Sequence, residues 1–353
     1  MRGFFLLALL PMLIPVETRL VLVKAHPEPV ITTRSRGAEG NKYGFEGGRV
    51  VKIGRTYHLF TSEMIGDPVW VRMRLAHWRS DDRLHWTRVS TLYESSGEFE
   101  GKDPRAALWS PLPVYDDKEE RWNLFYVAYR AAPNTAAAFR MNHEGRIWRA
   151  LSNVKGEAGI DGPYHDVGIV LEPGQDSEAW EGLQGTDSFF PYRVGNRWYA
   201  LYGSANTEKL PIEHWRVGIA SASSLAGPWR RRRTLNPAPI EPVFIENPIV
   251  ARLVDGRYLV VYDATRDPDA IGYSISEDGI HWPAGRSLVL QPKAGTWSPE
   301  IRTPLGLIDE HDGTFTIFYT GFEQAPDWTR LMQSQPVNTF AIGFARVKLV
   351  TGR

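Results

Sequence analysis

The sequence contains no cysteine among its 353 residues. Disulfide bonds, thiol catalysis and cysteine-ligated metals are therefore excluded. The chain also lacks an excess of charge, because Lys and Arg together number 41 and Asp and Glu together number 41. A neutral balance creates no overall field that would attract nucleic acid or an anionic membrane, so we expect neither as a partner.

Long hydrophobic runs are scarce. The longest, Phe4–Pro15, follows Arg2 and is too short for a membrane span of roughly 20 residues. The small-residue sequence VKA at Val23–Ala25 then offers a cleavage site. This layout is typical of a secretory signal peptide, so we expect residues 1–25 to be removed and the protein to reach the periplasm or the extracellular space.

Helical periodicity of useful length is absent too, and a strand pattern repeats along the chain instead. In each repeat a turn leads to an aromatic residue, alternating apolar positions and a second aromatic residue. The five copies are Gly54–Phe60, Glu120–Tyr126, Gly195–Tyr202, Asp255–Tyr262 and Asp312–Tyr319. An apolar run stands just upstream of each copy, so each repeat begins as a β-hairpin.

A second pair of strands follows the hairpin in each repeat. After Asp255–Tyr262, for example, come the apolar segment Ala270–Ser276, a turn, and the segment Arg286–Gln291. Four antiparallel strands repeated five times predict an all-β fold, the five-bladed β-propeller. A β-sandwich would not explain so regular a four-strand unit. We therefore expect residues 26–353 to form one propeller domain.

One phrase occurs twice, as SDDRLHW at Ser80–Trp86 and as SEDGIHW at Ser276–Trp282. In a propeller both copies fall at the turn between the two outer strands of a blade, far from the axis. Ser and Asp side chains can accept hydrogen bonds from turn amides, and a Trp can fill the space between adjacent sheets. We interpret both copies, including His85 and His281, as structural.

The start of the innermost strand of each blade faces one mouth of the central channel. Counting back from the repeat aromatics gives five equivalent positions there, namely Glu46, Ser110, Asp187, Glu246 and Glu300. Four of the five are carboxylic acids. A ring of like charges opposes folding, so it indicates a function.

Clustered carboxylates without cysteine or a histidine cluster favour glycoside hydrolysis. One carboxyl protonates the leaving oxygen, while another activates water or attacks carbon. Asp187 and Glu246 form the best catalytic pair, followed by Glu300 and Glu46. Their proximity should push the pKa values apart and so assign the acid and base roles. This chemistry needs no metal or other cofactor, and it leaves a structural calcium ion open.

Three segments carry a resemblance to a known group, namely LWSPLPVYDDKEERWNLFYVAY, IENPIVARLVDGRYLVVYDA and WSPEIRTPLGLIDEHDGTFTIFY. They resemble the five-bladed propeller glycoside hydrolases, which include arabinanases, β-xylosidases and fructosidases. The resemblance implies a base or nucleophile on blade one, where Glu46 stands. It also implies a pKa-tuning Asp on blade two, where Leu112 stands instead, and a Glu acid on blade three. Glu246 has a similar context to that acid but falls on blade four.

Further residues are candidates for binding a sugar. Trp109 and Trp297 each begin a WSP sequence at an inner strand, where an aromatic face could stack on a sugar ring. The remaining candidates for substrate binding are Asp103, Arg105, Ser110 and His143. Asp103 stands in GKDPR, which resembles the RDP of fructosidases. Insertions at Ile65–Val71 and Ala131–Gly145 could close one side of the pocket.

The sequence thus predicts an exported, exo-acting glycosidase whose partner is a carbohydrate, with no protein partner implied. Two alternatives stay open. A glycoside phosphorylase would need a cationic phosphate site beside the acid, and a non-catalytic sugar-binding propeller would pair off some of its axial carboxylates. Polysaccharide lyase chemistry is a weaker alternative, because it needs a Tyr or His base near a neutralised uronate. Fold resemblance alone does not choose among these functions.

Overall fold

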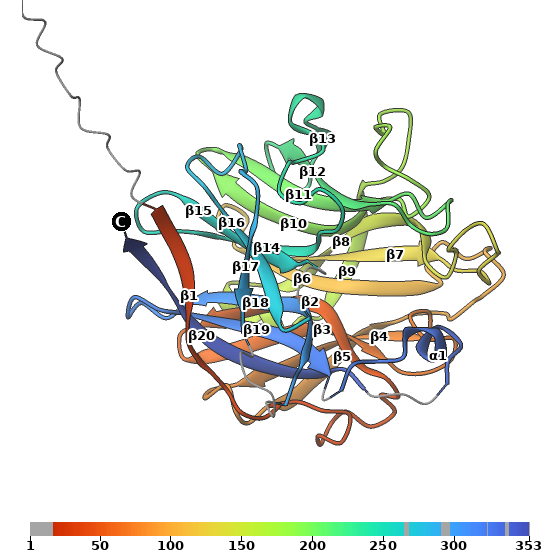
Figure 1. Ribbon diagram of the computed structural model, residues 1–353, viewed down its shortest axis with the longest axis horizontal. Helices are drawn as coiled ribbons and strands as arrows, with labels where there is room; N and C mark the ends of the chain where they lie inside the picture. The colour runs from red at the N-terminus through yellow and green to blue at the C-terminus, as the bar shows by residue number, and fades with distance from the viewer. Residues whose placement is uncertain (1–16, 265–267, 291–296, 323, 336–338, 353) are drawn as a thin grey trace, which may run out of the picture.

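The computed structural model describes residues 17–264, 268–290, 297–322, 324–335 and 339–352. Over these residues it confirms the predicted five-bladed β-propeller, with five sheets of four antiparallel strands (Figure 1). Within each of the first four blades, each strand hydrogen-bonds to the next along the chain, as expected for strands joined by hairpins. Sequence periodicity and turn chemistry were therefore sufficient to predict the architecture.

The blades follow one another along the chain. Blades one and two comprise β2 (Gly44–Ile53), β3 (Thr56–Met64), β4 (Met73–Ser80) and β5 (Thr87–Glu94), then β6 (Ala107–Asp116), β7 (Arg121–Arg130), β8 (His143–Lys155) and β9 (Tyr164–Leu171). Blades three and four comprise β10 (Asp187–Val194), β11 (Arg197–Ala205), β12 (Trp215–Ala222) and β13 (Arg230–Arg231), then β14 (Glu246–Arg252), β15 (Tyr258–Asp263), β16 (Ala270–Ser276) and β17 (Arg286–Val289). The helical segments are η1 (Glu157–Asp161), η2 (Arg233–Leu235) and α1 (Trp328–Met332).

Both ends of the chain build blade five. Its order is β1-β20-β19-β18, with bounds β18 (Glu300–Asp309), β19 (Phe315–Phe322), β20 (Ala341–Gly352) and β1 (Glu17–Ala25). Figure 1 shows β1 beside β20, the first and last strands of the chain. This pairing closes the ring of blades by hydrogen bonds between residues far apart in sequence.

The pairing of β1 corrects one sequence prediction. We expected residues 1–25 to be removed as a signal peptide and so to form no part of the propeller, but Glu17–Ala25 pairs with β20 and Leu20 is buried. The physical reason is that a propeller needs a fourth strand in its last blade, and the chain supplies it from the N-terminal side. Cleavage at Val23–Ala25 would remove that strand. The apolar run Phe4–Pro15 lies outside the described residues.

The repeated phrase forms the same turn in both copies. Asp82 accepts hydrogen bonds from the amides of Leu84 and His85 at 2.8 Å, and its second oxygen lies 2.6 Å from Nδ1 of His85. Asp278 makes the equivalent contacts with Ile280 and His281. The structural interpretation of both turns is confirmed.

The tryptophans of these turns fill the spaces between blades, as the sequence predicts. Trp86 of blade one meets Phe318 of blade five edge to face, with ring centroids 5.8 Å apart. Trp282 of blade four meets Tyr192 of blade three in the same way at 6.2 Å. Adjacent sheets are thus joined by aromatic packing, and between blades three and four also by hydrogen bonds, since Trp282 donates to the Tyr192 hydroxyl at 3.3 Å. Within the described part of the chain, none of the helices has the length and apolar character needed to span a bilayer.

Candidate active site

A bulge interrupts the first strand of every blade near its start. The register shifts directly after the pairs Glu46↔Ser62, Trp109↔Val127, Asp187↔Gly203, Glu246↔Asp263 and Ile301↔Gly321. In four blades the next residue has a left-handed backbone, and these residues are Gly47, Ser110, Ser188 and Asn247. A bulge re-aims the neighbouring side chain, and bulges are frequent beside active sites. This repeated irregularity sets the direction of the axial side chains.

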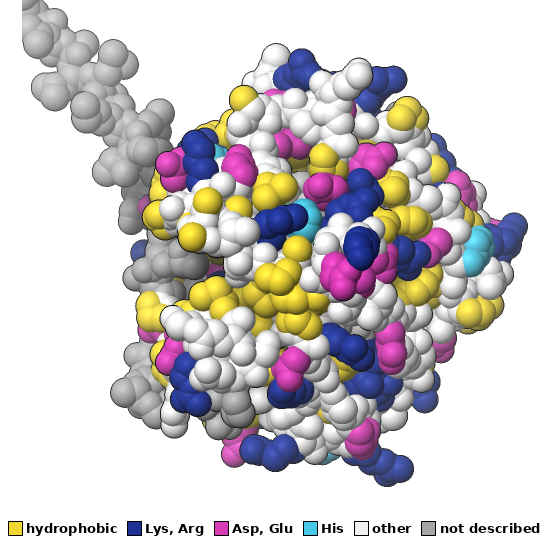
Figure 2. Space-filling model, turned by 90° about the vertical axis from the view of Figure 1, so that its right-hand side faces the viewer, with side chains coloured by type: hydrophobic (Ala, Val, Ile, Leu, Met, Phe, Trp, Pro, Cys, Tyr) yellow, Lys and Arg dark blue, Asp and Glu magenta, His cyan; other side chains and the backbone are white. Residues whose placement is uncertain are grey.

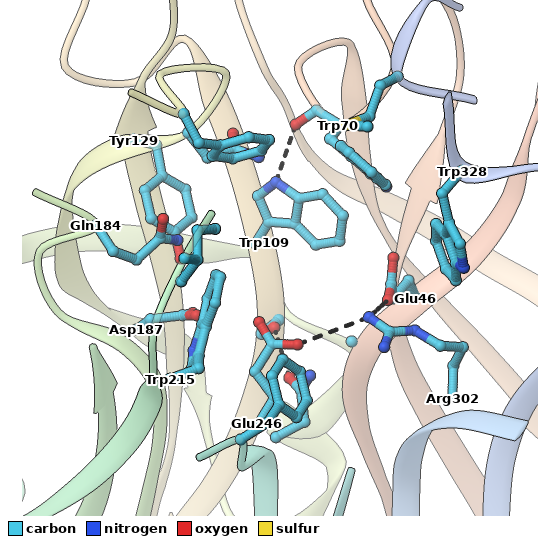
Figure 3. A pocket seen from close by; sticks show the side chains of 18 of the residues that line it. Glu46, Trp70, Trp109, Tyr129, Gln184, Asp187, Trp215, Glu246, Arg302 and Trp328 are labelled. Atoms are coloured by element: carbon cyan, nitrogen blue, oxygen red, sulfur yellow. Dashed lines mark hydrogen bonds and ion pairs between the residues drawn. The ribbon is translucent and has the colours of Figure 1, made fainter. Parts of the chain in front are cut away.

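The axial side chains face a cavity of about 480 Å³ (Figure 3). Its floor holds the carboxyl groups of Glu46, Asp187 and Glu246 together with the guanidinium of Arg302. Its wall is largely aromatic and aliphatic. The wall residues are Trp70, Trp109, Tyr129, Phe139, Leu210, Pro211, Ile212, Trp215, Phe244, Trp328 and Met332. Small-molecule sites usually combine a largely apolar wall with a few polar or ionisable groups.

The connections between the second and third strands of four blades build much of this wall. Trp70 lies between β3 and β4, Phe139 between β7 and β8, and Leu210 between β11 and β12. Trp328 belongs to α1, between β19 and β20. Figure 2 views the side on which α1 lies in Figure 1 and shows hydrophobic side chains gathered near its centre. Both insertions predicted to border the pocket, Ile65–Val71 and Ala131–Gly145, contribute lining residues.

Arg302, on blade five, pairs with carboxylates from blades one and four. Its guanidinium lies 3.3 Å from Oε1 of Glu46, 3.7 Å from Oε2 of Glu246 and 3.1 Å from Oδ2 of Asp263. Thr303 also donates a hydrogen bond to Glu46, at 3.4 Å. Because Arg302 is surrounded by carboxylates, its positive charge offsets part of their mutual repulsion. Glu46 is therefore the best neutralised of the three cavity acids.

Burial raises the pKa of both members of the predicted catalytic pair. For Asp187, hydrogen bonds from Tyr129 and from the amide of Ser188, at 2.5 Å, act in the opposite direction and favour the carboxylate. For Glu246, burial places the pKa well above its usual range, and the negative charge of Asp187 raises it further. Arg302 opposes that shift in part. The arrangement favours a protonated Glu246 beside an ionised Asp187.

The structure brings five of the predicted site residues together around the cavity, namely Glu46, Trp109, Ser110, Asp187 and Glu246. In Figure 3 Glu46, Asp187 and Glu246 come from different blades and point into one space. Trp109 donates its Nε1 hydrogen to the carbonyl of Trp70 at 3.0 Å, which fixes the indole in the wall. The count placed the axial position of blade two one residue too far along the strand. Trp109 is the last paired residue before the bulge, and Ser110 is the first residue of the bulge.

Glu300 needs a similar correction. Glu300 was counted as the axial residue of blade five. The last paired residue before the bulge is Ile301, so Glu300 lies one residue too early in the strand. Glu300 is also not among the residues that line the cavity. Burial raises the pKa of Glu300, with Arg302 acting against that shift. The side chain that the innermost strand of blade five, β18, sends into the cavity is Arg302, which sequence counting missed.

The other predicted substrate contacts lie outside the cavity lining and have structural partners. Asp103 accepts hydrogen bonds from the Ser96 hydroxyl and the Arg105 amide. Arg105 pairs with Asp166 at 2.6 Å. His143 is buried with Nδ1 2.9 Å from the Arg140 carbonyl, and Trp297 stacks on Tyr319. Their placement favours packing roles over substrate contact.

One group of the described residues has a metal-ligand composition. His58, His77 and Asp161 each present a donor atom, and the three atoms lie within 4.8 Å of one another. None of the three lines the cavity. Burial lowers the pKa of both histidines, to about 3 for His77, so both are neutral at physiological pH.

Comparisons with known proteins agree with this fold. The chain is similar in structure to Zg3597, a family 117 glycoside hydrolase from the marine bacterium Zobellia galactanivorans, with a TM-score of 0.58 and 12% identity over 95% of this chain and 90% of that one. It is also similar to a thermostable family-43 glycoside hydrolase (TM-score 0.56, 14% identity, 89% and 96% covered). An α-L-arabinofuranosidase from Lactobacillus brevis gives a TM-score of 0.52 at 12% identity, with 85% and 91% covered. No protein-family model matches the sequence, and a search of curated proteins gives no significant match. The likeness shows the five-bladed propeller fold of glycoside hydrolases.

Proposed function

We propose that this protein is a glycoside hydrolase that removes terminal sugar units from an oligosaccharide or polysaccharide. The observation that carries the proposal is the pair Asp187 and Glu246, two buried carboxyls that face one cavity and of which the first raises the pKa of the second. A buried pair of acids with separated protonation states is what glycoside hydrolysis requires. The structural neighbours named as glycoside hydrolases support the same class of reaction.

Glu246 is the general acid in this proposal. Its raised pKa keeps it protonated near neutral pH, so it can give a proton to the glycosidic oxygen as the bond to the anomeric carbon breaks. Hydrogen bonds from Tyr129 and the Ser188 amide oppose the effect of burial on the pKa of Asp187 and favour its carboxylate form, which in this proposal acts as the nucleophile or activates water. Glu46 and Arg302 then position sugar hydroxyls, because each can accept or donate hydrogen bonds at the cavity floor.

The shape of the cavity supports exo action. Its wall comes largely from four connections between strands, and a site of about 480 Å³ suits one or two sugar units better than an extended chain. Trp109, Trp215 and Trp328 offer flat faces on which the apolar side of a sugar ring can stack. Export follows if the segment before Glu17 is a signal peptide.

The arginine pairing argues against the phosphorylase alternative. Arg302 is the one Lys or Arg among the described residues that line the cavity, and three carboxylates already surround it. A phosphate dianion would have to displace these acids or bind beside them, which costs more electrostatic energy than it returns. Hydrolysis needs no anion site.

A panel of 4-nitrophenyl glycosides, assayed with and without inorganic phosphate, tests the proposal. Release of 4-nitrophenol that is independent of phosphate supports a hydrolase, and release that requires phosphate would support a phosphorylase. Sugar binding by calorimetry without turnover of any glycoside in the panel would favour the binding module. Pentofuranosides and pentopyranosides belong in the panel, since a neighbour of this fold is an α-L-arabinofuranosidase.

A further inference from the structure

A histidine pair and an aspartate meet between blades one and two, away from the cavity. His58 lies on β3 and His77 on β4, both in blade one, while Asp161 ends η1 of blade two. His58 is the third residue of β3, whereas Ser62, the partner of the cavity residue Glu46, lies four residues further along. At about 3.3 Å per residue the two places are roughly 13 Å apart along the strand. The cluster is therefore independent of the proposed catalytic site.

The two imidazoles are fixed by their surroundings. His77 is fully buried and stacks on Phe60, with ring centroids 4.3 Å apart. Nε2 of His77 lies 3.0 Å from Nδ1 of His58, and the two rings are also stacked. Asp161 differs, because its side chain is 47% exposed and it ends a short 3-10 segment. The group thus combines two preset nitrogen donors with one carboxylate that is free to adjust.

The buried Nδ1 of His77 has no hydrogen-bond partner. A buried polar atom without a partner costs free energy, so it needs an explanation such as a bound ion. Oδ1 of Asp161 lies 3.8 Å from this nitrogen and 4.0 Å from Nδ1 of His58. These separations are too long for hydrogen bonds. They are close to the ~3.3 Å between two ligand atoms on one tetrahedral zinc, given metal–ligand distances of about 2.0–2.1 Å.

We propose that His58, His77 and Asp161 form a binding site for a divalent transition-metal ion, with zinc the best fit. Nδ1 of each histidine and one oxygen of Asp161 bind the ion, the hydrogen bond between Nε2 of His77 and Nδ1 of His58 gives way to the bond with the metal, and water completes the four-coordinate shell. Imidazole donors favour zinc over calcium or magnesium, which prefer oxygen ligands. Closing the site takes a movement of a few tenths of an ångström, and the exposed Asp161 can supply it.

Metal at this site would join two blades. His58 and His77 belong to blade one and Asp161 to blade two, so the ion adds a bond between two sheets that already meet through aromatic packing and through hydrogen bonds such as that from the Ser110 amide to the Ser62 hydroxyl. Binding to the folded state alone raises stability in proportion to the logarithm of metal concentration over Kd. The expected role is structural, and hydrolysis in the cavity does not depend on it.

Titration of the full-length chain, without a polyhistidine tag and after treatment with a chelator, tests the site. The chain should take up one equivalent of Zn²⁺ with a rise in Tm, and Co²⁺ should give the visible absorption of a four-coordinate nitrogen–oxygen site. Asp161→Asn alters an exposed side chain, so it should fold and bind Zn²⁺ at least about tenfold more weakly. His85→Gln is the matched control, because His85 also pairs with an aspartate but has no third donor.

The control variant should bind Zn²⁺ like the wild type. The proposal is overturned if the wild type takes up no equivalent of Zn²⁺, if Asp161→Asn binds as tightly as the wild type, or if both variants lose binding equally. Each of these outcomes would mean that the histidine pair is held by packing alone. Glycosidase activity is not a readout here, so failure of the metal site leaves the proposed function untouched.

Discussion

Acidic residues occur in two contrasting settings in this molecule, the axial cavity and the repeated turns at the blade rim. Asp82 and Asp278 in the turns are half-exposed and accept hydrogen bonds from backbone amides. The side-chain hydrogen bond from His85 lowers the pKa of Asp82 most, and the backbone amides of His85 and Leu84 lower it further. For Asp187 and Glu246 in the cavity, burial raises the pKa instead. The pKa of a carboxyl group is thus lowered in the turns and raised in the cavity.

This contrast separates structural from functional acids. A turn aspartate is stabilised by its own neighbours, so its charge helps folding. The cavity acids lie close enough to repel one another, and Arg302 neutralises them only in part. Perturbed pKa values in a cavity are a property of catalytic groups. The predictions below test this division, beginning with the largest expected effect.

Replacing the proposed acid should have the largest effect. Glu246→Gln keeps the shape of the side chain but removes its proton, so glycosidase kcat should fall by about 10²–10⁴-fold. Asp187→Asn should lose on the order of a hundredfold or more, because it removes the ionised partner. Asp278→Asn is the matched control from the rim and should keep near-normal kcat. Near-normal activity in both cavity variants would remove them from the mechanism.

The pH dependence of kcat/KM should report the cavity pair. The acid must be protonated to act, so the rate should fall as pH rises through the raised pKa of Glu246. This alkaline limb should be absent from the residual activity of Glu246→Gln. Asp187→Asn should abolish the acid limb and move the alkaline limb to lower pH, because the negative charge of Asp187 raises the pKa of Glu246. An unchanged alkaline limb in Glu246→Gln would assign it to another group.

The aromatic wall should affect binding more than chemistry. Trp328→Ala removes a stacking face at the edge of the cavity, on a helix that contributes no acid. Loss of one aromatic contact is worth roughly 1 kcal/mol, so KM should rise about five- to tenfold with little change in kcat. Steady-state kinetics on the best glycoside from the panel measure this. A large fall in kcat at constant KM would show that Trp328 orients the reacting atoms.

The smallest effects concern stability. The pKa of Asp82 is lowered in the fold, so the stability that it contributes is present at neutral pH and is lost as pH falls through that pKa. Asp82→Ala should therefore cost about 1 kcal/mol at pH 7 and less in acid. Glu246 has a raised pKa, so its contribution is lost as pH rises, and Glu246→Gln should unfold no more easily than the wild type at pH 8. Urea unfolding at several pH values separates the two cases.

The sequence was enough to predict the propeller because the fold repeats itself. Five hairpins with aromatic residues at similar places constrain the sheets, and the turns at Asp82 and Asp278 satisfy their own hydrogen bonds locally. The N-terminal strand was missed for the opposite reason. Glu17–Ala25 gains its place only by pairing with β20 at the far end of the chain, which no local pattern indicates.

The candidate site was predicted in part. Counting along strands located Glu46, Asp187 and Glu246, but the count was off by one residue in blades two and five. A small residue or Asn directly after the axial residue, as at Gly47, Ser188 and Asn247, is the signal that could have fixed the register. The wall residues on the connections, and the ion pairs of Arg302, depend on tertiary folding and have no comparable signal.

The central claim is that Glu246 gives a proton to the leaving group while Asp187 remains ionised. The most direct test compares Glu246→Gln with the wild type on aryl glycosides whose phenols differ in pKa. If Glu246 is the acid, the variant should lose little rate with an activated leaving group such as 2,4-dinitrophenol and progressively more as the phenol becomes less acidic. A rate loss that is the same for every leaving group would contradict the account and leave Glu246 as a binding residue.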